Sequence, residues 1–307
     1  MAPTTASMGH QARLGTKNET NYGTAVTVDE AFVFTSESIA KRGVIVERSG
    51  LRGTRSHQAD DVRVGPYTVG GRLVLEPTPQ DLSIWLPRIL GAPADGANFH
   101  LAETLPSFTL SIDRVAKVFT YAGCKVNRAT LEGAQGGLLK LSLDLVAQSE
   151  SVAAAGTFPT LSASVAQPYI FSDLALTLAA TAREVKEFEL SIDNGLVTDR
   201  FMNSITIVSV PEGDRNIMLR TVHAWAAANA DLYAQALAGA AGTLQLTNAL
   251  GGTPPTGYRT TFSFATLQVP DRSPNVPGRN EFFLNLEMAA RRVGSAPELA
   301  VTHDATP

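Results

Sequence analysis

The sequence predicts a mainly β fold with α elements, arranged as two tandem β-sandwich or barrel-like domains that each carry one short flanking helix. Short runs of alternating polar and apolar residues, separated by glycine- and proline-containing turns, recur along the chain. Such runs are typical of antiparallel strands. Two segments show the apolar spacing of a helix, and they begin with the same dipeptide, at Asp81-Leu82 and Asp231-Leu232. Between them lies a stretch without charged residues, 151–172.

These features divide the chain into five segments. We expect an N-terminal arm (1–30), a first β domain (31–150), an uncharged linker (151–168), a second β domain (169–292) and a C-terminal tail (293–307). A chain of 307 residues can bury roughly 75% of its unfolded surface without disulfide support. Its one cysteine, Cys124, excludes an intrachain disulfide and is interpreted as a small buried hydrophobe.

The first half is expected to be built from strands that are rich in β-branched and aromatic residues. The runs are residues 32–34, 44–46, 71–76, 108–112, 115–121, 125–131 and 138–146. Residues 48–67 contain Gly50, Gly53, Gly65 and Pro66 and are interpreted as a loop. The glycine-rich run 133–137 predicts a hairpin turn between the last two strands.

The first helix is predicted over residues 79–90. Leu82, Trp85, Leu86, Ile89 and Leu90 recur at the spacing that places them on one apolar face. Either Thr78 or Asp81 can cap the N-terminus, and Pro79 suits the first turn. Pro87 is unfavourable inside the helix and is expected to kink its last turn. Gly91 is expected to end it in a left-handed conformation.

The second half repeats this order of elements. Strands are expected at residues 174–178, 187–192, 204–210, 217–225, 243–246, 258–269 and 281–289, with a helix at about 229–237. Two registers of the repeat compete. Aligning the helices requires an offset of 150 residues, whereas aligning the phrase Phe-x-Leu-Ser-Ile-Asp at 108–113 with its copy at 188–193 requires 80. We prefer the 150-residue register, because it repeats a whole order of elements rather than six residues.

The charge is shared unequally between the halves. Residues 1–155 carry 15 basic and 15 acidic side chains, and residues 156–307 carry 10 and 14. A net charge of −4 makes bulk electrostatic binding of nucleic acid unexpected. No apolar segment suits a membrane span and no secretory signal is visible at the N-terminus, so we expect a cytosol-like compartment of synthesis.

No motif predicts an enzyme or a cofactor. The chain contains no glycine-rich phosphate loop, nucleophile elbow, CxxC or HExxH pattern. His57 with Asp60 and Asp61 is the one local group of a histidine and carboxylates, and a solvated loop explains it better than a metal site. Chemistry therefore does not indicate the function, and we expect a non-enzymatic protein without cofactors or metal.

A basic cluster is the strongest candidate for a contact surface. It lies within about two dozen residues, diluted by Glu47, Asp60 and Asp61, and it consists of Lys41, Arg42, Arg48, Arg52, Arg55 and Arg63. A solvated loop is the simplest interpretation. Nucleic-acid binding would favour interleaved aromatic residues, which the cluster lacks. Contact with a neighbouring subunit is the third interpretation, because arginine pairs well with carboxylates at interfaces.

Several short motifs, taken in order, resemble the phage tail tube proteins of long-tailed, non-contractile phages, in the version with a doubled tube domain. Residues 17–24 (KNETNYGT) resemble the "ET-x-YGT" start of these proteins, and residues 34–39 the strand that follows. Residues 70–73 with the helix up to Gly91, and then residues 121–126 (YAGCKV), resemble the next elements. The resemblance spans most of the chain.

The resemblance implies a structural virion protein, assembled in the host cytoplasm, whose rings stack into the hollow tail tube. A doubled subunit implies homotrimeric rings with six similar domains. The implied partners are further copies, the tape-measure protein inside the tube, the tail terminator and distal tail proteins, and double-stranded DNA in transient passage through an acidic lumen. The arm, the basic cluster and the C-terminal tail would connect rings.

Two alternatives stay open. Another ring-forming tail component, such as a tail terminator or baseplate-hub protein, would form single rings rather than polymers. A two-domain β-sandwich carbohydrate-binding protein would need a strip of exposed aromatic residues. That alternative is less favoured, because aromatic residues make up 7% of the chain and Trp85 falls on the apolar face of the predicted helix.

Overall fold

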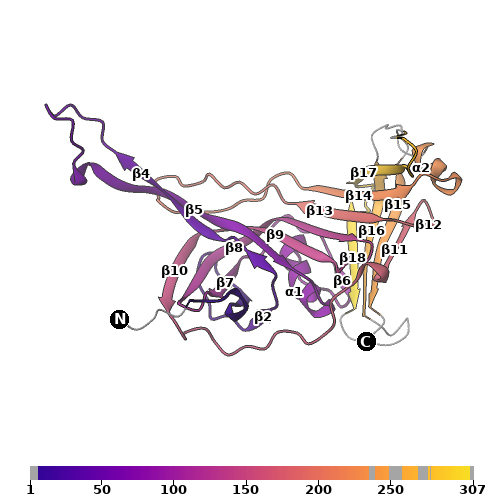
Figure 1. Cartoon of the computed structure of the whole chain (residues 1–307), viewed down its shortest axis with the longest axis horizontal. Coiled ribbons are helices and arrows are strands. Elements are labelled where there is room, and N and C mark those ends of the chain that lie inside the picture. The colour runs from indigo at the N-terminus through magenta and orange to yellow at the C-terminus, as the bar shows by residue number, and fades with distance from the viewer. Residues whose placement is uncertain (1–5, 235–238, 249–257, 269–275, 277, 305–307) are drawn as a thin grey trace.

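The computed structural model describes residues 6–234, 239–248, 258–268, 276 and 278–304. The predicted mainly β fold is confirmed, with two α-helices in this part of the chain. Figure 1 shows an elongated molecule with a long hairpin at one end and the second half of the chain at the other.

The strands are β1 (Arg13–Asn18), β2 (Glu30–Phe32), β3 (Ser36–Glu37), β4 (Ala40–Glu47), β5 (Val62–Leu75), β6 (Asn98–Phe99), β7 (Phe108–Asp113), β8 (Lys117–Ala134), β9 (Lys140–Ala147), β10 (Ser149–Ala154), β11 (Leu174–Leu178), β12 (Thr181–Arg183), β13 (Glu187–Asp193), β14 (Asn216–Ala224), β15 (Ala240–Asn248), β16 (Tyr258–Gln268), β17 (Phe283–Arg291) and β18 (Leu299–Asp304). The helices are α1 (Pro79–Leu90) and α2 (Ala230–Ala234).

Strand β8 joins the two halves of the chain. It is 18 residues long and has antiparallel partners along its whole length. One edge pairs with β10 and then β9, and the other pairs with β7 and then β13. Because β13 belongs to the second half, backbone hydrogen bonds cross the boundary between the halves. They form one sheet in the order β4–β5–β9–β8–β13–β14–β17.

The strand pairings of the first half recur in the second. The first half contains β1–β2, β1–β7, β7–β8, β8–β10, β8–β9, β5–β9 and β4–β5. In the same order, the second half contains β11–β12, β11–β15, β15–β16, β16–β18, β16–β17, β14–β17 and β13–β14. Helix α1 follows β5 as α2 follows β14.

Helix α1 confirms the predicted bounds, capping residues and apolar face. Thr78 and Asp81 form a capping box, in which the Asp81 amide donates to Thr78 Oγ1 and the Thr78 amide donates to Asp81 Oδ2. Pro79 occupies the first position, and Gly91 ends the helix with φ 103°. Pro87 lies within the last turn, where its carbonyl still accepts the Gly91 amide.

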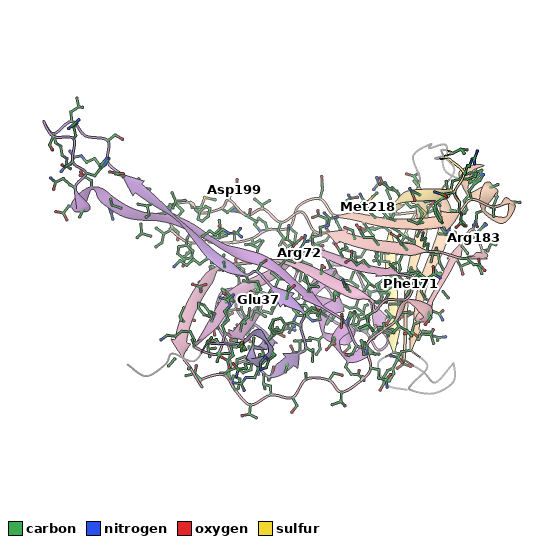
Figure 2. All side chains as sticks on the ribbon, viewed as in Figure 1. Glu37, Arg72, Phe171, Arg183, Asp199 and Met218 are labelled. Carbon is green, nitrogen blue, oxygen red and sulfur yellow. The ribbon has the colours of Figure 1, made fainter. Side chains whose placement is uncertain are left out.

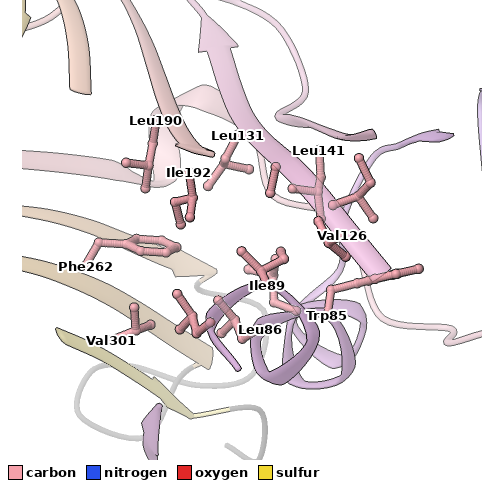
Figure 3. Packing of buried hydrophobic residues seen from close by; sticks show 14 of the residues in the cluster. Trp85, Leu86, Ile89, Val126, Leu131, Leu141, Leu190, Ile192, Phe262 and Val301 are labelled. Atoms are coloured by element: carbon pink, nitrogen blue, oxygen red, sulfur yellow. The ribbon is translucent and has the colours of Figure 1, made fainter. Parts of the chain in front are cut away.

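The helix occupies the centre of the core. Figure 3 shows Leu86 and Ile89 facing side chains of β8, β9 and β13 on one side and of β16 and β18 on the other. Trp85 is fully buried and packs against Phe32 and Phe108 at ring-centroid distances of 5.2 and 5.6 Å. A single hydrophobic cluster therefore contains residues of both halves. None of the helices in the described ranges is long and apolar enough to cross a membrane.

Other elements differ from the sequence-based prediction. The strand predicted at 204–210 is absent, because Ile207 and Val210 pack in a small separate cluster instead of joining a ladder. The loop predicted at 48–67 ends earlier, since β5 begins at Val62. The two strands predicted at 115–121 and 125–131 are both parts of β8. Residues 235–237 of the predicted second helix and residue 269 of a predicted strand lie outside the described residues.

The expected N-terminal arm is partly folded into the sheet. Strand β1 pairs with β2 on one edge and β7 on the other. The Arg88 guanidinium, buried on α1, donates to Thr16 Oγ1, Asn18 Oδ1 and Glu30 Oε2 at 2.8, 2.7 and 2.6 Å. Charge-assisted hydrogen bonds of this kind compensate for the cost of burying the guanidinium. Residues 13–18 are therefore structural, and a free connector could include only residues before them.

The expected C-terminal tail also contains a strand. Strand β18 pairs with β16 and with β6 of the first half. Its His303 is buried, with Nδ1 2.8 Å from Thr260 Oγ1, which in turn lies 3.0 Å from the Tyr169 hydroxyl. Burial lowers the pKa of His303 to about 4 from an ordinary value of 6.5 and raises the pKa of Tyr169 to about 12. Both side chains are therefore neutral at pH 7.

We predict that His303 makes the fold sensitive to acid. Because its pKa is lower in the folded state, the unfolded chain binds the proton more tightly, and stability falls as the pH drops from 6.5 towards 4. The two pKa values correspond to about 3 kcal/mol. Urea unfolding of dilute protein at several pH values measures this loss. The variant His303→Gln should lose that part of the pH dependence, whereas His57→Gln, at an exposed position, should keep it. An identical pH dependence in wild type and His303→Gln would contradict the assignment.

Candidate functional site

The β4–β5 hairpin projects far from the body of the molecule (Figure 1). Its strands are joined by residues 48–61, and every residue from 41 to 60 is exposed. A β-bulge between Gly43 and Ile45 interrupts the ladder. Bulges increase the local twist of a strand. The hairpin therefore presents both of its faces to the surroundings along most of β4.

All six residues of the predicted basic cluster lie on this hairpin. Lys41 and Arg42 belong to β4, Arg63 belongs to β5, and Arg48, Arg52 and Arg55 lie in the connecting segment. Lys41 Nζ lies 3.9 Å from the centroid of the Tyr67 ring, and Arg52 forms an ion pair with Asp61. Within the described ranges, the other four side chains contact no carboxylate. Their exposure is compatible with both the solvated-loop and the subunit-contact interpretations.

Sequence reasoning missed the apolar character of the same hairpin. Six large aliphatic side chains are between 42% and 107% exposed on it: Val44, Ile45, Val46, Leu51, Val62 and Val64. We call this set the apolar hairpin surface. The run 44–46 predicted a strand, and the usual environment of such a run is burial on both faces. Contiguous exposed apolar surface marks interaction sites in soluble proteins.

A second extended segment lies beside the hairpin. Residues 194–215, which we call the strap, connect β13 to β14 and run along β5 (Figure 1). The Tyr67 amide of β5 donates to the Ile205 carbonyl of the strap at 3.0 Å. Figure 2 labels Asp199 on the strap and Arg72 on β5. The strap also exposes Met202 and Ile205, at 69% and 53%, so the apolar surface continues across both segments.

The strap is fastened to the first half by buried polar contacts. Asn194 Nδ2 donates to the carbonyls of Ile89 and Val126 at 3.2 and 3.1 Å. Glu212 Oε1 accepts hydrogen bonds from Lys125 Nζ at 2.7 Å and from the Leu105 amide at 2.8 Å. Burial alone would raise the pKa of Glu212, but these hydrogen bonds outweigh it and lower the pKa. The carboxylate is therefore held in its charged form.

The motif at residues 17–24 has a structural role at the same junction. The Glu19 carboxylate accepts hydrogen bonds from the Gly23 and Gly123 amides and from the hydroxyls of Ser107 and Thr109, at 2.8 to 2.9 Å. Gly123 has φ 68°, and a Cβ there would lie 2.8 Å from Gln148 Cβ. Residues 17–24 are thus hydrogen-bonded to β7 and to the middle of β8. At this point the partners of β8 change from β7 and β10 to β9 and β13.

The sheet shared by the two halves presents a second surface. One face packs on α1 and the core, and the other is hollowed by a depression of about 930 Å³. This depression is lined by charged side chains from five different strands. They stand in one row across the sheet, each directly opposite the next in the strand register, in the order Lys140, Glu132, Glu189, Arg220 and Glu287. We call this the concave face.

The reactive side chains that the sequence singles out lie in different environments. The described residues contain no group of three His, Cys, Asp or Glu side chains placed to hold a metal ion. Cys124 is buried, as predicted, and burial raises the pKa of its thiol above its ordinary value. His57 pairs with Glu47 at 2.6 Å. The exposed aliphatic and basic side chains of the hairpin are the features best suited to contact with another macromolecule.

One comparison with known proteins identifies a family. A family model described as phage tail tube protein matches residues 9–287. The match spans the hairpin, the strap and the strands of the concave face as far as Glu287 in β17. No curated protein matches the chain significantly.

We predict that the hairpin tip does not stabilise the isolated subunit. Its polar contacts are internal to the hairpin, as in the Arg52–Asp61 and His57–Glu47 pairs. Replacing residues 49–60 by an Asn-Gly turn should change the free energy of unfolding by less than about 1 kcal/mol, as expected for exposed segments. Urea denaturation measures this change. A loss of more than about 3 kcal/mol would show that the tip belongs to the folding unit.

Proposed function

Since the chain belongs to the phage tail tube protein family, we propose that its copies assemble into stacked rings that form the hollow tail tube of a long-tailed, non-contractile phage. The tube encloses the tape-measure protein during assembly in the host cytoplasm and later conducts genomic DNA. The tail terminator and distal tail proteins cap its ends. Membership of this family makes the chain a structural component of the virion tail.

The observation that carries the proposal is the open edge of strand β4. Among the described residues, β4 has a strand partner on one edge only, which is β5. An open edge recruits strands from other chains. The β8–β13 pairing, which joins the first half to a strand of the second half, provides a template for this contact. By analogy, β4 of one copy would add to the second half of the next copy.

The repeated strand pairings support domain duplication at the 150-residue register. The two copies of the phrase Phe-x-Leu-Ser-Ile-Asp fall in β7 and β13. These two strands have different places in the repeated pattern, so the repeated pairings do not support the 80-residue register. A chain with two similar units needs three copies to present six units around a ring. We therefore propose homotrimeric, pseudo-hexameric rings.

The hairpin is proposed to connect one ring to the next. Its counterpart in the second half, the strap, is bound to the first half of its own chain, which leaves the hairpin as the projecting connection. Burial of the apolar hairpin surface against another copy would release about 25 cal/mol per Å² of apolar area. Arg42, Arg48, Arg55 and Arg63 then provide charges for carboxylates of that copy.

Electron microscopy of purified protein tests the proposal. Negatively stained wild type should form hollow tubes above a critical concentration, and a tail terminator or hub protein would stop at single rings. The variant Val64→Asp should raise the critical concentration at least tenfold, since an unpaired charge would be buried in the contact. The control Val165→Asp changes a residue that is 100% exposed on the linker and should leave tubes intact. Monomeric wild type at all concentrations, or normal tubes from Val64→Asp, would contradict the proposed interface.

A further inference from the structure

We propose that strand β10 of each copy binds the α2 end of another copy, and that this contact holds neighbouring copies together in a ring. The inference rests on the proposed function and deepens it, because it names a contact between copies that is separate from the open edge of β4. The template for the contact is the one that the two halves make within a single chain.

Within the chain, strand β18 of the second half is covered by the first half. Leu299, Val301 and His303 lie on one face of β18, and each of these side chains is at most 4% exposed. Figure 3 shows Leu86 of α1 on the side of the helix that faces Val301. The outer edge of β18 pairs with β6 of the first half, where Val301 is opposite Phe99. One half therefore covers both a face and an edge of a strand from the other half.

Strand β10 has the place of β18 in the repeated pairing pattern, since β10 pairs with β8 as β18 pairs with β16. It is much less covered than β18. Val152 is 52% exposed, and Ala154, which lies on the same face of the strand, is exposed as well. Among the described residues, β10 pairs only with β8, so its outer edge has no strand partner. The face and the edge that are covered in β18 are both open in β10.

The exposed Val152 side chain ends a row that is otherwise part of the core. Phe119 of β8 is directly opposite Val152, and Ile112 of β7 is opposite Phe119. Ile112 is fully buried, and Phe119 is half-buried against the same hydrophobic cluster. In the second half, the row from Leu176 to Val301 across the matching strands is at most 3% exposed throughout. An apolar side chain at the open end of a core row suits contact with another subunit.

The α2 end of another copy is the occupant that the repeat indicates, because α2 follows β14 as α1 follows β5. The exposed side chains of Ala226, Ala227 and Ala230 give this end a small apolar surface. Its neighbouring carboxylate, on Asp231, is held by Arg183 at 2.7 Å. Alanine side chains allow the close approach of a strand, and they match Val152 and Ala154 in polarity.

The two surfaces lie far apart in one copy, so the contact must join different copies. Figure 1 shows β10 on the side of the first half that is away from the second half, and α2 at the far side of the second half. A contact between two different surfaces of identical copies closes into a ring when the rotation allows it. Strand β10 also contacts β5, the partner of β4. One neighbour can therefore make both the β4 contact and the β10 contact.

A charge at Val152 should block assembly without unfolding the subunit. Val152→Asp would bury an unpaired carboxylate in the contact, so we expect the critical concentration for tube formation to rise at least tenfold. The urea midpoint of dilute protein should stay unchanged, because Val152 is exposed in a single copy. The control Ser151→Asp adds the same charge at the next residue, which is exposed on the opposite face of the strand, and should assemble normally. Normal tubes from Val152→Asp, or an equal loss with Ser151→Asp, would overturn the inference.

Crosslinking detects the contact without a disruptive variant. The double variant Val152→Cys/Ala230→Cys, treated with a short bismaleimide after assembly, should give covalent dimers and trimers on a denaturing gel. Wild type should give none, because Cys124 is buried. The control Val165→Cys/Ala230→Cys moves one cysteine to the exposed linker and should give at least tenfold less product. An absence of product from Val152→Cys/Ala230→Cys, or an equal amount from the control, would overturn the contact.

The crosslinking result also separates this contact from the proposed function. If wild type forms no tubes and Val152→Cys/Ala230→Cys still links different chains, the contact is supported and the proposed tube is wrong. If tubes form and the cysteine pair does not link chains, the contact is wrong and the tube is supported.

Discussion

The continuous pairing of β8 is the constraint on which the rest of the structure depends. Its edges hold β9 and β10 on one side and β7 and β13 on the other. These backbone bonds make a single sheet of two sequence halves, and they place α1 between the sheet and the strands of the second half. The bulges along β8 and the positive φ of Gly123 let one strand serve two sets of partners. Because of the β8–β13 register, the two halves share one continuous sheet.

A repeated architecture is used in two different ways in this chain. The β4–β5 hairpin and the β13–β14 strap occupy corresponding places in the pairing pattern. The strap is hydrogen-bonded to the first half of its own chain through Asn194 and Glu212. The hairpin instead projects from the molecule with its aliphatic side chains exposed. We propose that the chain contains one connection in its closed form and leaves the other for a further copy. That asymmetry explains why so apolar a surface occurs on a β hairpin outside the core.

Local signals predicted local structure well. The capping residues and the apolar spacing of α1, and the glycine-rich turn after β8, act over a few residues, and the structure has them where the sequence indicates. The pairing of β13 with β8 has no such signal, because the partners are separated by more than fifty residues. The composition of residues 44–46 predicts a strand, and the structure confirms it, but composition does not reveal that this strand lies outside the core. The positions of the basic side chains can be read from the sequence, whereas the alignment of Glu132, Glu189, Arg220 and Glu287 across the concave face depends on the register between strands.

Cryo-electron microscopy of the assembled tube tests the central claim most directly. The account predicts rings in which the sheet continues from one copy to the next, because β4 of each copy adds to the second half of its neighbour, and in which the β4–β5 hairpin contacts the adjacent ring. A map in which the sheet breaks between copies, or in which the hairpin contacts no other copy, would contradict it.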